Sequence, residues 1–324
     1  MKIKVFIWLL VLAWLWGPAF LFVAVAVQDI PPFTLVASRV SLAAIILYSI
    51  LRAQGHNLPA FGSIWKHFAI VGLLYNAVPY VLLSWGQLYI DSALAAILIG
   101  TTPLFTMLLA HLFTSNEHLT PVKMVGVALG FGGLVVLLTP ALITGVQATI
   151  WGLLAALLAA ASYGGALVYA QQKLRGLPPL VGPTAQLTTA AIFLIPISLV
   201  VEQPYTLPLP AWSAVGSLLL LAVLSTALAF IVYYRALEIT NATTLSMITY
   251  MIPIVATFLG VIVLHEQLSG HVYLSSILIL LGMMTVNGVF RATWRQLTGI
   301  TIRPWLHNHP TVGSRLRRMG ETNC

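Results

Sequence analysis

The sequence predicts an all-α integral membrane protein with ten transmembrane helices, arranged as two inverted repeats of five. Three observations predict this fold: an apolar composition, ten apolar segments of similar length, and matching motifs in the two halves. Of the 324 residues, 60% are hydrophobic and only 7% are charged, and the mean hydropathy is +0.98. Soluble domains carry about 25% charged residues, so we expect lipid to cover most of the surface.

Each of the ten apolar segments is long enough to cross a bilayer as a helix, which takes about 20 residues. Short connectors marked by proline, glycine, asparagine and aspartate separate them. The expected spans are residues 5–26, 33–52, 67–86, 93–113, 121–139, 149–170, 181–201, 211–234, 243–264 and 271–290. The first span follows Lys2 and Lys4, as a signal sequence would, but it is longer than the roughly 7–15 apolar residues of such a sequence. We therefore predict that it is retained.

The positive charges predict the orientation of the chain in the membrane. When the N-terminus is placed in the cytoplasm, every Lys and Arg except Arg39 falls on the cytoplasmic side or in the basic segment 291–324. Cytoplasmic loops carry an excess of Lys and Arg, so both termini are predicted to be cytoplasmic. The net charge of +8 does not indicate nucleic-acid binding, because the cations lie at the ends of apolar runs and in this tail. The tail is predicted to be disordered or to lie on the membrane surface.

Short motifs recur in the two halves of the chain, in the same order and at a nearly constant offset. The matching pairs are Trp16-Gly17 with Tyr163-Gly164, Pro31-Pro32 with Pro178-Pro179, and Glu117-His118-Leu119-Thr120 with Glu266-Gln267-Leu268-Ser269. Because each repeat has an odd number of spans, the second enters the membrane in the opposite direction. Residues 1–140 and 141–290 are therefore predicted as inverted repeats, which are typical of secondary transporters with the substrate site where the halves meet.

Two prolines, Pro103 and Pro253, lie near the middle of the fourth and ninth expected spans. Proline removes a backbone N–H and displaces the carbonyl one turn earlier, and such a carbonyl needs a partner in lipid. Thr101 is close enough in sequence to supply one. We interpret the prolines as kinks that face a central cavity, with freed carbonyls that bind a polar ligand. Kinks satisfied by neighbouring helices are the alternative.

Aromatic residues recur in the spans that could face one central cavity. Together they could form a cage whose ring faces and hydroxyls bind an amphipathic solute. Trp and Tyr near span ends also form interfacial belts, which is the alternative for Trp85 and Tyr234. The cavity candidates are Trp16, Tyr80, Trp85, Tyr163, Tyr234 and Tyr250.

Arg39 is the one full charge well inside an expected span. An ionisable group within the membrane is a functional hypothesis by default, and here it would bind a carboxylate of the substrate. The alternative is a structural role, in which the side chain extends to the membrane surface or binds backbone carbonyls between helices. The short distance along the chain from Pro32 favours the structural role.

Several function classes lack their residues in this sequence. There is no glycine-lysine phosphate-binding loop, no cysteine–histidine cluster for a metal and no serine–histidine–aspartate set in a suitable context. We therefore expect no enzyme activity, no cofactor and no metal. Stripes of small residues such as Gly126 and Gly130 let helices approach closely, either within the chain or in a homodimer.

The chain resembles the drug/metabolite transporter superfamily, and within it the ten-span EamA-type exporters, over residues 5–290. The resemblance rests on the order of the motifs given above together with three more segments. These are Gly100-Thr101-Thr102-Pro103-Leu104, Tyr233-Tyr234-Arg235-Ala236-Leu237-Glu238 and Tyr250-Met251-Ile252-Pro253. The resemblance implies an inner-membrane carrier with a central cavity that moves small metabolites outward by alternating access. Aromatic amino acid exporters of the YddG type are one branch to which it points.

The predicted function is export of a small, partly apolar metabolite, with amino acids and related compounds first. The expected partners are the small-molecule substrate and the lipid bilayer, and no nucleic acid. A nucleotide-sugar, lipid-linked or drug carrier of the same superfamily is the alternative. A membrane-embedded enzyme or a receptor, from a different class, is disfavoured by the missing catalytic residues and the short loops.

Overall fold

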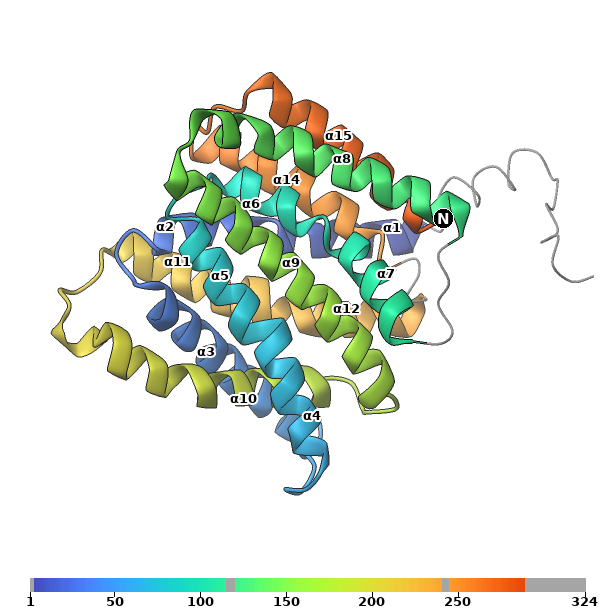
Figure 1. The fold of residues 1–324 in the computed structure, drawn as a ribbon. Helices are drawn as coiled ribbons and strands as arrows, with labels where there is room; N and C mark the ends of the chain where they lie inside the picture. The colour runs from blue at the N-terminus through green and yellow to red at the C-terminus, as the bar shows by residue number, and fades with distance from the viewer. Residues whose placement is uncertain (1–2, 115–119, 241–244, 289–324) are drawn as a thin grey trace, which may run out of the picture. The chain divides into compact units, whose positions relative to one another are not determined.

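The computed structural model describes residues 3–114, 120–240 and 245–288. Within these ranges every regular element is helical, as the sequence predicts (Figure 1). Eight helical segments are long and apolar enough to cross a membrane, and two shorter apolar helices follow them. Together they correspond to the ten predicted spans. The predicted tail and the segment Glu117-His118-Leu119 lie outside the described residues.

The first five spans are divided into nine elements. In chain order these are α1 (Ile3–Trp16), α2 (Pro18–Ala26), α3 (Pro32–Ala53), α4 (Ile64–Val71), the π-helical turn η1 (Gly72–Ala77), α5 (Val78–Gly86), α6 (Ser92–Ile99), α7 (Thr102–Phe113) and α8 (Pro121–Thr144). Helix α8 continues past Pro140, beyond the end expected at residue 139. Gly145 ends it in the left-handed conformation, at φ 66°, that glycine adopts without strain.

The second five spans contain three further short turns. The elements are α9 (Gln147–Lys173), α10 (Val181–Ile197), the π-helical turn η2 (Ser198–Glu202), the 3₁₀ turn η3 (Pro204–Thr206), α11 (Trp212–Ala222), the π-helical turn η4 (Val223–Leu228), α12 (Ala229–Ile239), α14 (Ile248–Val263) and α15 (Gly270–Val286). Helix α14 begins later than the expected residue 243. Residues 241–244 lie outside the described part of the chain.

Several spans change their helical geometry near the middle. The first span breaks at Gly17, directly before Pro18, and the fourth breaks at Gly100 and Thr101, before Pro103. In the third and eighth spans the α-helix is interrupted by the π turns η1 and η4. Pro79 follows η1, and its missing N–H accounts for a local change in the hydrogen-bond ladder.

Small residues bring α8 and α15 into close contact along their length (Figure 1). A Cβ atom on Gly126 would lie 2.8 Å from the carbonyl oxygen of Gly282. A Cβ on Gly133 would lie 2.9 Å from the carbonyl oxygen of Ser275. The glycine stripe predicted from the sequence therefore packs within the chain, and a homodimer stays a prediction.

Helices from the first half of the chain pack mainly on helices from the second half. Helix α3 lies on α10, α6 on α14 and α8 on α15, so each of these contacts joins corresponding spans of the two halves (Figure 1). Helix α9 likewise packs on α5 and α7, and α1 packs on α12 and α14. The two largest buried clusters contain residues from both halves. A site in the interior is consequently built from both.

Candidate functional site

Six aromatic side chains from both halves of the chain gather in the interior. We call them the aromatic cluster: Trp16 on α1, Tyr75 in η1, Tyr80 on α5, Tyr163 on α9, and Tyr233 and Tyr234 on α12. The ring of Tyr163 meets those of Tyr75 and Tyr80 edge to face, with centroids 5.0 and 6.4 Å apart. Tyr234 packs against the same buried core as these three.

The remaining members of the aromatic cluster extend it toward α1. The ring of Tyr233 lies 5.5 Å from that of Tyr234 and 5.6 Å from that of Trp16, measured between centroids. Four of the predicted cavity residues, Trp16, Tyr80, Tyr163 and Tyr234, are thus brought together. Tyr75 and Tyr233 complete the cluster, and sequence reasoning did not select them.

Arg39 lies beside the aromatic cluster and is almost fully buried, with 6% of its surface exposed. Its Nε donates a hydrogen bond of 2.9 Å to Oγ1 of Thr226 in η4. Its Cζ atom lies 3.7 Å from the ring centroid of Tyr80, in cation–π geometry. The side chain neither reaches the surface nor binds a backbone carbonyl described in the structure. The side chain instead links α3 to η4 and to α5, so a structural role between helices and the binding of a substrate carboxylate both stay predictions.

The two π turns carry Thr226, which bonds Arg39, and other buried polar groups. The Thr226 hydroxyl donates to the carbonyl of Leu221, five residues earlier, in keeping with the wider π turn. Asn76 in η1 donates a long hydrogen bond of 3.5 Å to Tyr80. Oδ1 of Asn76 and Oγ of Ser225 are buried without a hydrogen-bond partner among the described residues. Single π turns are often found at functional sites.

The sequence carries a signal for these groups. Asn76, Ser225 and Thr226 are polar residues near the middle of largely apolar spans, and Pro79 marks the irregular helix at η1. Buried polar side chains are normally hydrogen-bonded, so a cluster of them at membrane depth indicates either a packing network or a site.

Two predicted aromatic residues make no ring contact with the aromatic cluster among the described residues. Trp85 pairs with Tyr89 near the end of α5, with centroids 5.1 Å apart. The Tyr250 hydroxyl donates to the carbonyl of Met283 at 3.4 Å and accepts from Nδ2 of Asn287 at 2.5 Å. These contacts join α14 to α15 and its C-terminal end.

The break of the fourth span lies against Pro253, which sits inside the uninterrupted helix α14 of the ninth span. A Cβ on Gly100 would lie 3.2 Å from the ring of Pro253. The carbonyls near Pro103 already have donors, because the Thr101 hydroxyl bonds the Leu98 carbonyl at 2.6 Å and the Thr102 hydroxyl bonds that of Ile99 at 2.7 Å. At Pro103, the threonines therefore occupy the carbonyls that we expected to bind a ligand.

Two glutamates close the end of the bundle at which α3 and α6 begin, which we call the capped end. Glu202 accepts from the backbone N–H groups of Phe33 and Thr34, at 2.9 and 2.6 Å, and from the Thr34 hydroxyl at 2.7 Å. Glu266 accepts from the N–H groups of Ser92 and Ala93, at 2.7 and 3.0 Å. Each carboxylate comes from the second half of the chain and caps a helix of the first half.

A third carboxyl group, that of Asp91, lies at the same end. Partial burial of this side chain raises its pKa above the ordinary value, and the neighbouring Glu266 carboxylate raises it further. Asp91 precedes the first residue of α6, yet its side chain makes no capping hydrogen bond. Glu266 takes that role instead.

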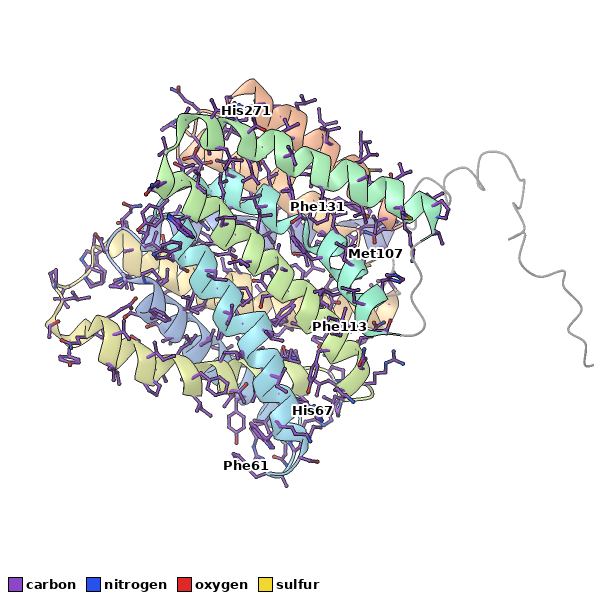
Figure 2. All side chains as sticks on the ribbon, viewed as in Figure 1. Phe61, His67, Met107, Phe113, Phe131 and His271 are labelled. Carbon is purple, nitrogen blue, oxygen red and sulfur yellow. The ribbon has the colours of Figure 1, made fainter. Side chains whose placement is uncertain are left out.

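A pocket of about 300 Å³ lies where α3 ends, at the opposite end from the capped end. It reaches the aromatic cluster through Tyr234, and Gln54, Arg235 and Glu238 are among its polar lining residues. His67 near the start of α4 lies low in the view of Figure 2, and His271 near the start of α15 lies at its top. Nδ1 of His67 lies 2.7 Å from the Tyr169 hydroxyl on α9.

A model of the EamA-like transporter family matches residues 3–139 and 150–288. The chain is 28% identical over 283 residues to the uncharacterized transporter YoaV of Bacillus subtilis, covering 87% of this chain and 96% of the relative. It is 26% identical to the uncharacterized inner membrane transporter YedA of Escherichia coli K12, covering 84% and 87%. Protein PecM of Dickeya dadantii is 26% identical, covering 85% and 89%.

A solved crystal structure has the same fold. Its TM-score is 0.62 at 20% sequence identity, and the match covers 90% of this chain and 99% of the other. At this identity the likeness extends to the fold alone.

Proposed function

Because the chain belongs to the EamA-like transporter family, and is thus a multi-pass integral membrane transporter, we propose that it exports small metabolites by alternating access. Amino acids and related compounds are the first substrates to test. The relatives YoaV and YedA are named as transporters, and YedA as one of the inner membrane. These names support transport across the inner membrane. They do not name a substrate, so the substrate is inferred from the residues of the site.

The observation that carries this proposal is the aromatic cluster between the two halves of the chain. Trp16, Tyr75 and Tyr80 come from the first half, and Tyr163, Tyr233 and Tyr234 from the second. Aromatic rings offer an apolar face with a polar hydroxyl or N–H at the edge. A solute held between rings of both halves would lose one wall when the halves rock apart. The cluster therefore suits alternating access.

The proposed arrangement of the halves is that of inverted repeats. The end of η2 lies at the start of α3, since Glu202 bonds the first N–H groups of that helix. The segment after α14 likewise lies at the start of α6, through Glu266. Corresponding spans of the two halves thus run in opposite directions, which supports inversion. By the charge distribution, the capped end would be extracytoplasmic.

Efflux from proteoliposomes preloaded with labelled amino acids tests the proposal. We expect selective efflux by the intact chain and a loss of it in Tyr163→Ala, which removes the ring that joins Tyr75 and Tyr80. Tyr205→Ala, at an exposed tyrosine in η3, is the matched control. Absence of efflux for every amino acid with folded protein would contradict the amino acid assignment and direct the test to nucleotide sugars, lipids and drugs.

A further inference from the structure

We propose that Arg39 binds a carboxylate group of the transported solute, so that the carrier favours carboxylic acids over the corresponding carboxamides. The inference rests on the proposed function and adds the chemical group that the site recognises. It follows from the charge, the burial and the incomplete hydrogen bonding of one side chain.

The positive charge of Arg39 has no acidic partner among the described residues. Glu202 and Glu266 are bonded to helix starts at the capped end, and Glu238 pairs with Arg235. Arginine stays protonated in proteins, and an uncompensated charge in the membrane interior is costly. A residue with this cost is expected to gain a counter-charge at some stage of its working cycle, and an anionic solute supplies one.

The hydrogen bonds of Arg39 leave most of its donors unused. A guanidinium carries five N–H donors, and Nε alone has an acceptor among the described residues, at Thr226. The Tyr80 ring supports the face of the guanidinium, because Cζ lies 3.7 Å from the ring centroid. Thr226 and Tyr80 thus hold the group in place and leave the Nη atoms for a ligand. Two parallel N–H donors match the two oxygens of a carboxylate.

Two buried polar atoms on residues next to the partners of Arg39 would complement such a ligand. Asn76, which bonds Tyr80, has a buried Oδ1 without a partner, and Ser225, next to Thr226, has a buried Oγ without one. Buried polar atoms of this kind are uncommon in native proteins. A donor group on the solute, such as an ammonium or a hydroxyl, would satisfy them. An anionic group with a nearby donor is the pattern of an amino or hydroxy acid.

The test compares acids with their amides on the purified full-length chain in lipid nanodiscs. Thermal stabilisation is measured with L-phenylalanine against L-phenylalaninamide, L-leucine against L-leucinamide, and phenylacetate against phenylacetamide. We expect the acids to bind about 10- to 100-fold more tightly, the factor expected for hydrogen bonds to a charged group. Arg39→Gln should remove this preference. Arg39→Lys, which keeps the charge without the planar fork, should keep the preference at lower affinity.

Arg52→Gln is the matched control, because Arg52 is an exposed arginine on the last turn of the same helix. Equal binding of acid and amide by the intact chain, no stabilisation by any acid, or a preference that survives in Arg39→Gln would each overturn the proposal.

Flux measurements distinguish the failure of this inference from the failure of the proposed function. Efflux of the amides as fast as of the matching acids supports the carrier and overturns the role of Arg39. Acid binding that depends on Arg39, without any flux, supports the role of Arg39 and overturns the proposed transport.

Discussion

The capped end and the interior of the molecule compensate charge in opposite ways, with half-buried carboxylates at one and a buried guanidinium in the other. At the capped end, Glu202 and Glu266 each accept at least two hydrogen bonds from the first N–H groups of a helix. In the interior, Arg39 makes one described hydrogen bond and lies on an aromatic ring. A charge whose partners are complete holds the fold in one arrangement, whereas a charge with spare donors is ready for a ligand.

The difference has a physical basis in what each charge faces. A helix start offers several N–H groups without partners inside the helix, and its dipole favours negative charge. A carboxylate placed there is stabilised without any counter-ion. A guanidinium inside a span has no comparable set of backbone acceptors, because helical carbonyls are already bonded. Its compensation must come from side chains or from a bound solute.

The largest expected effect is at the capped end. The double variant Glu202→Ala with Glu266→Ala should lower the free energy of unfolding by about 2–4 kcal/mol, the sum of two lost helix caps with N–H donors left unpaired. Thermal unfolding in nanodiscs measures it. Glu238→Ala is the control, since Glu238 forms an exposed ion pair with Arg235 and should cost less than about 1 kcal/mol. If the double variant and Glu238→Ala lowered the free energy of unfolding equally, the two caps would have no structural role.

Tyr250 tests whether a hydroxyl group with complete hydrogen bonds has a structural role, as the capping glutamates do. Tyr250→Phe removes the hydrogen bonds to Met283 and Asn287 and should lower the free energy of unfolding by about 1 kcal/mol. Substrate selectivity in efflux should stay unchanged, because Tyr250 makes no ring contact with the aromatic cluster in the described part of the chain. A change in selectivity with normal stability would instead place Tyr250 in the site.

Arg39 should show a smaller effect on stability than on function. Since no described carboxylate is left unpaired by its removal, Arg39→Met should change the free energy of unfolding by less than about 1 kcal/mol. Denaturant unfolding of the two proteins side by side measures the difference. A loss of about 3 kcal/mol or more, as for a broken buried ion pair, would assign Arg39 to the structural class with the glutamates.

The smallest effect concerns Asp91 and depends on pH. Because the pKa of Asp91 is raised in the folded state, the unfolded chain loses this proton first as pH rises, and the folded state becomes relatively less stable. Asp91→Asn should therefore raise stability slightly at pH 7, by at most about 0.5 kcal/mol at this exposed position. The gain should disappear in acid, below the ordinary pKa of aspartate. The melting temperatures of both proteins at pH 7 and pH 3.5 test this. An equal rise in melting temperature at both pH values would exclude the charge of Asp91 as the cause.

The sequence by itself determined where the chain is helical and which residues terminate or interrupt its spans. In lipid an apolar segment must satisfy its backbone internally, so segments such as 33–52 and 93–113 correspond closely to Pro32–Ala53 and Ser92–Phe113. The break before Pro103 was predicted for the same local reason, the missing proline N–H. The charge distribution likewise singled out Arg39, and motif order indicated the EamA-like family.

Only the tertiary structure decided which side chains meet. The cluster includes Tyr75 and Tyr233 and leaves out Trp85 and Tyr250, because membership depends on how each helix is rotated about its axis. The π turns η1 and η4 alter that rotation near the middle of their spans, and an extra residue in a turn moves every following side chain to a new face. The partner of Arg39 is Thr226, on the eighth span. Uniformly apolar spans carry little information about such rotations, since a helix that is apolar on all sides does not specify which face is buried.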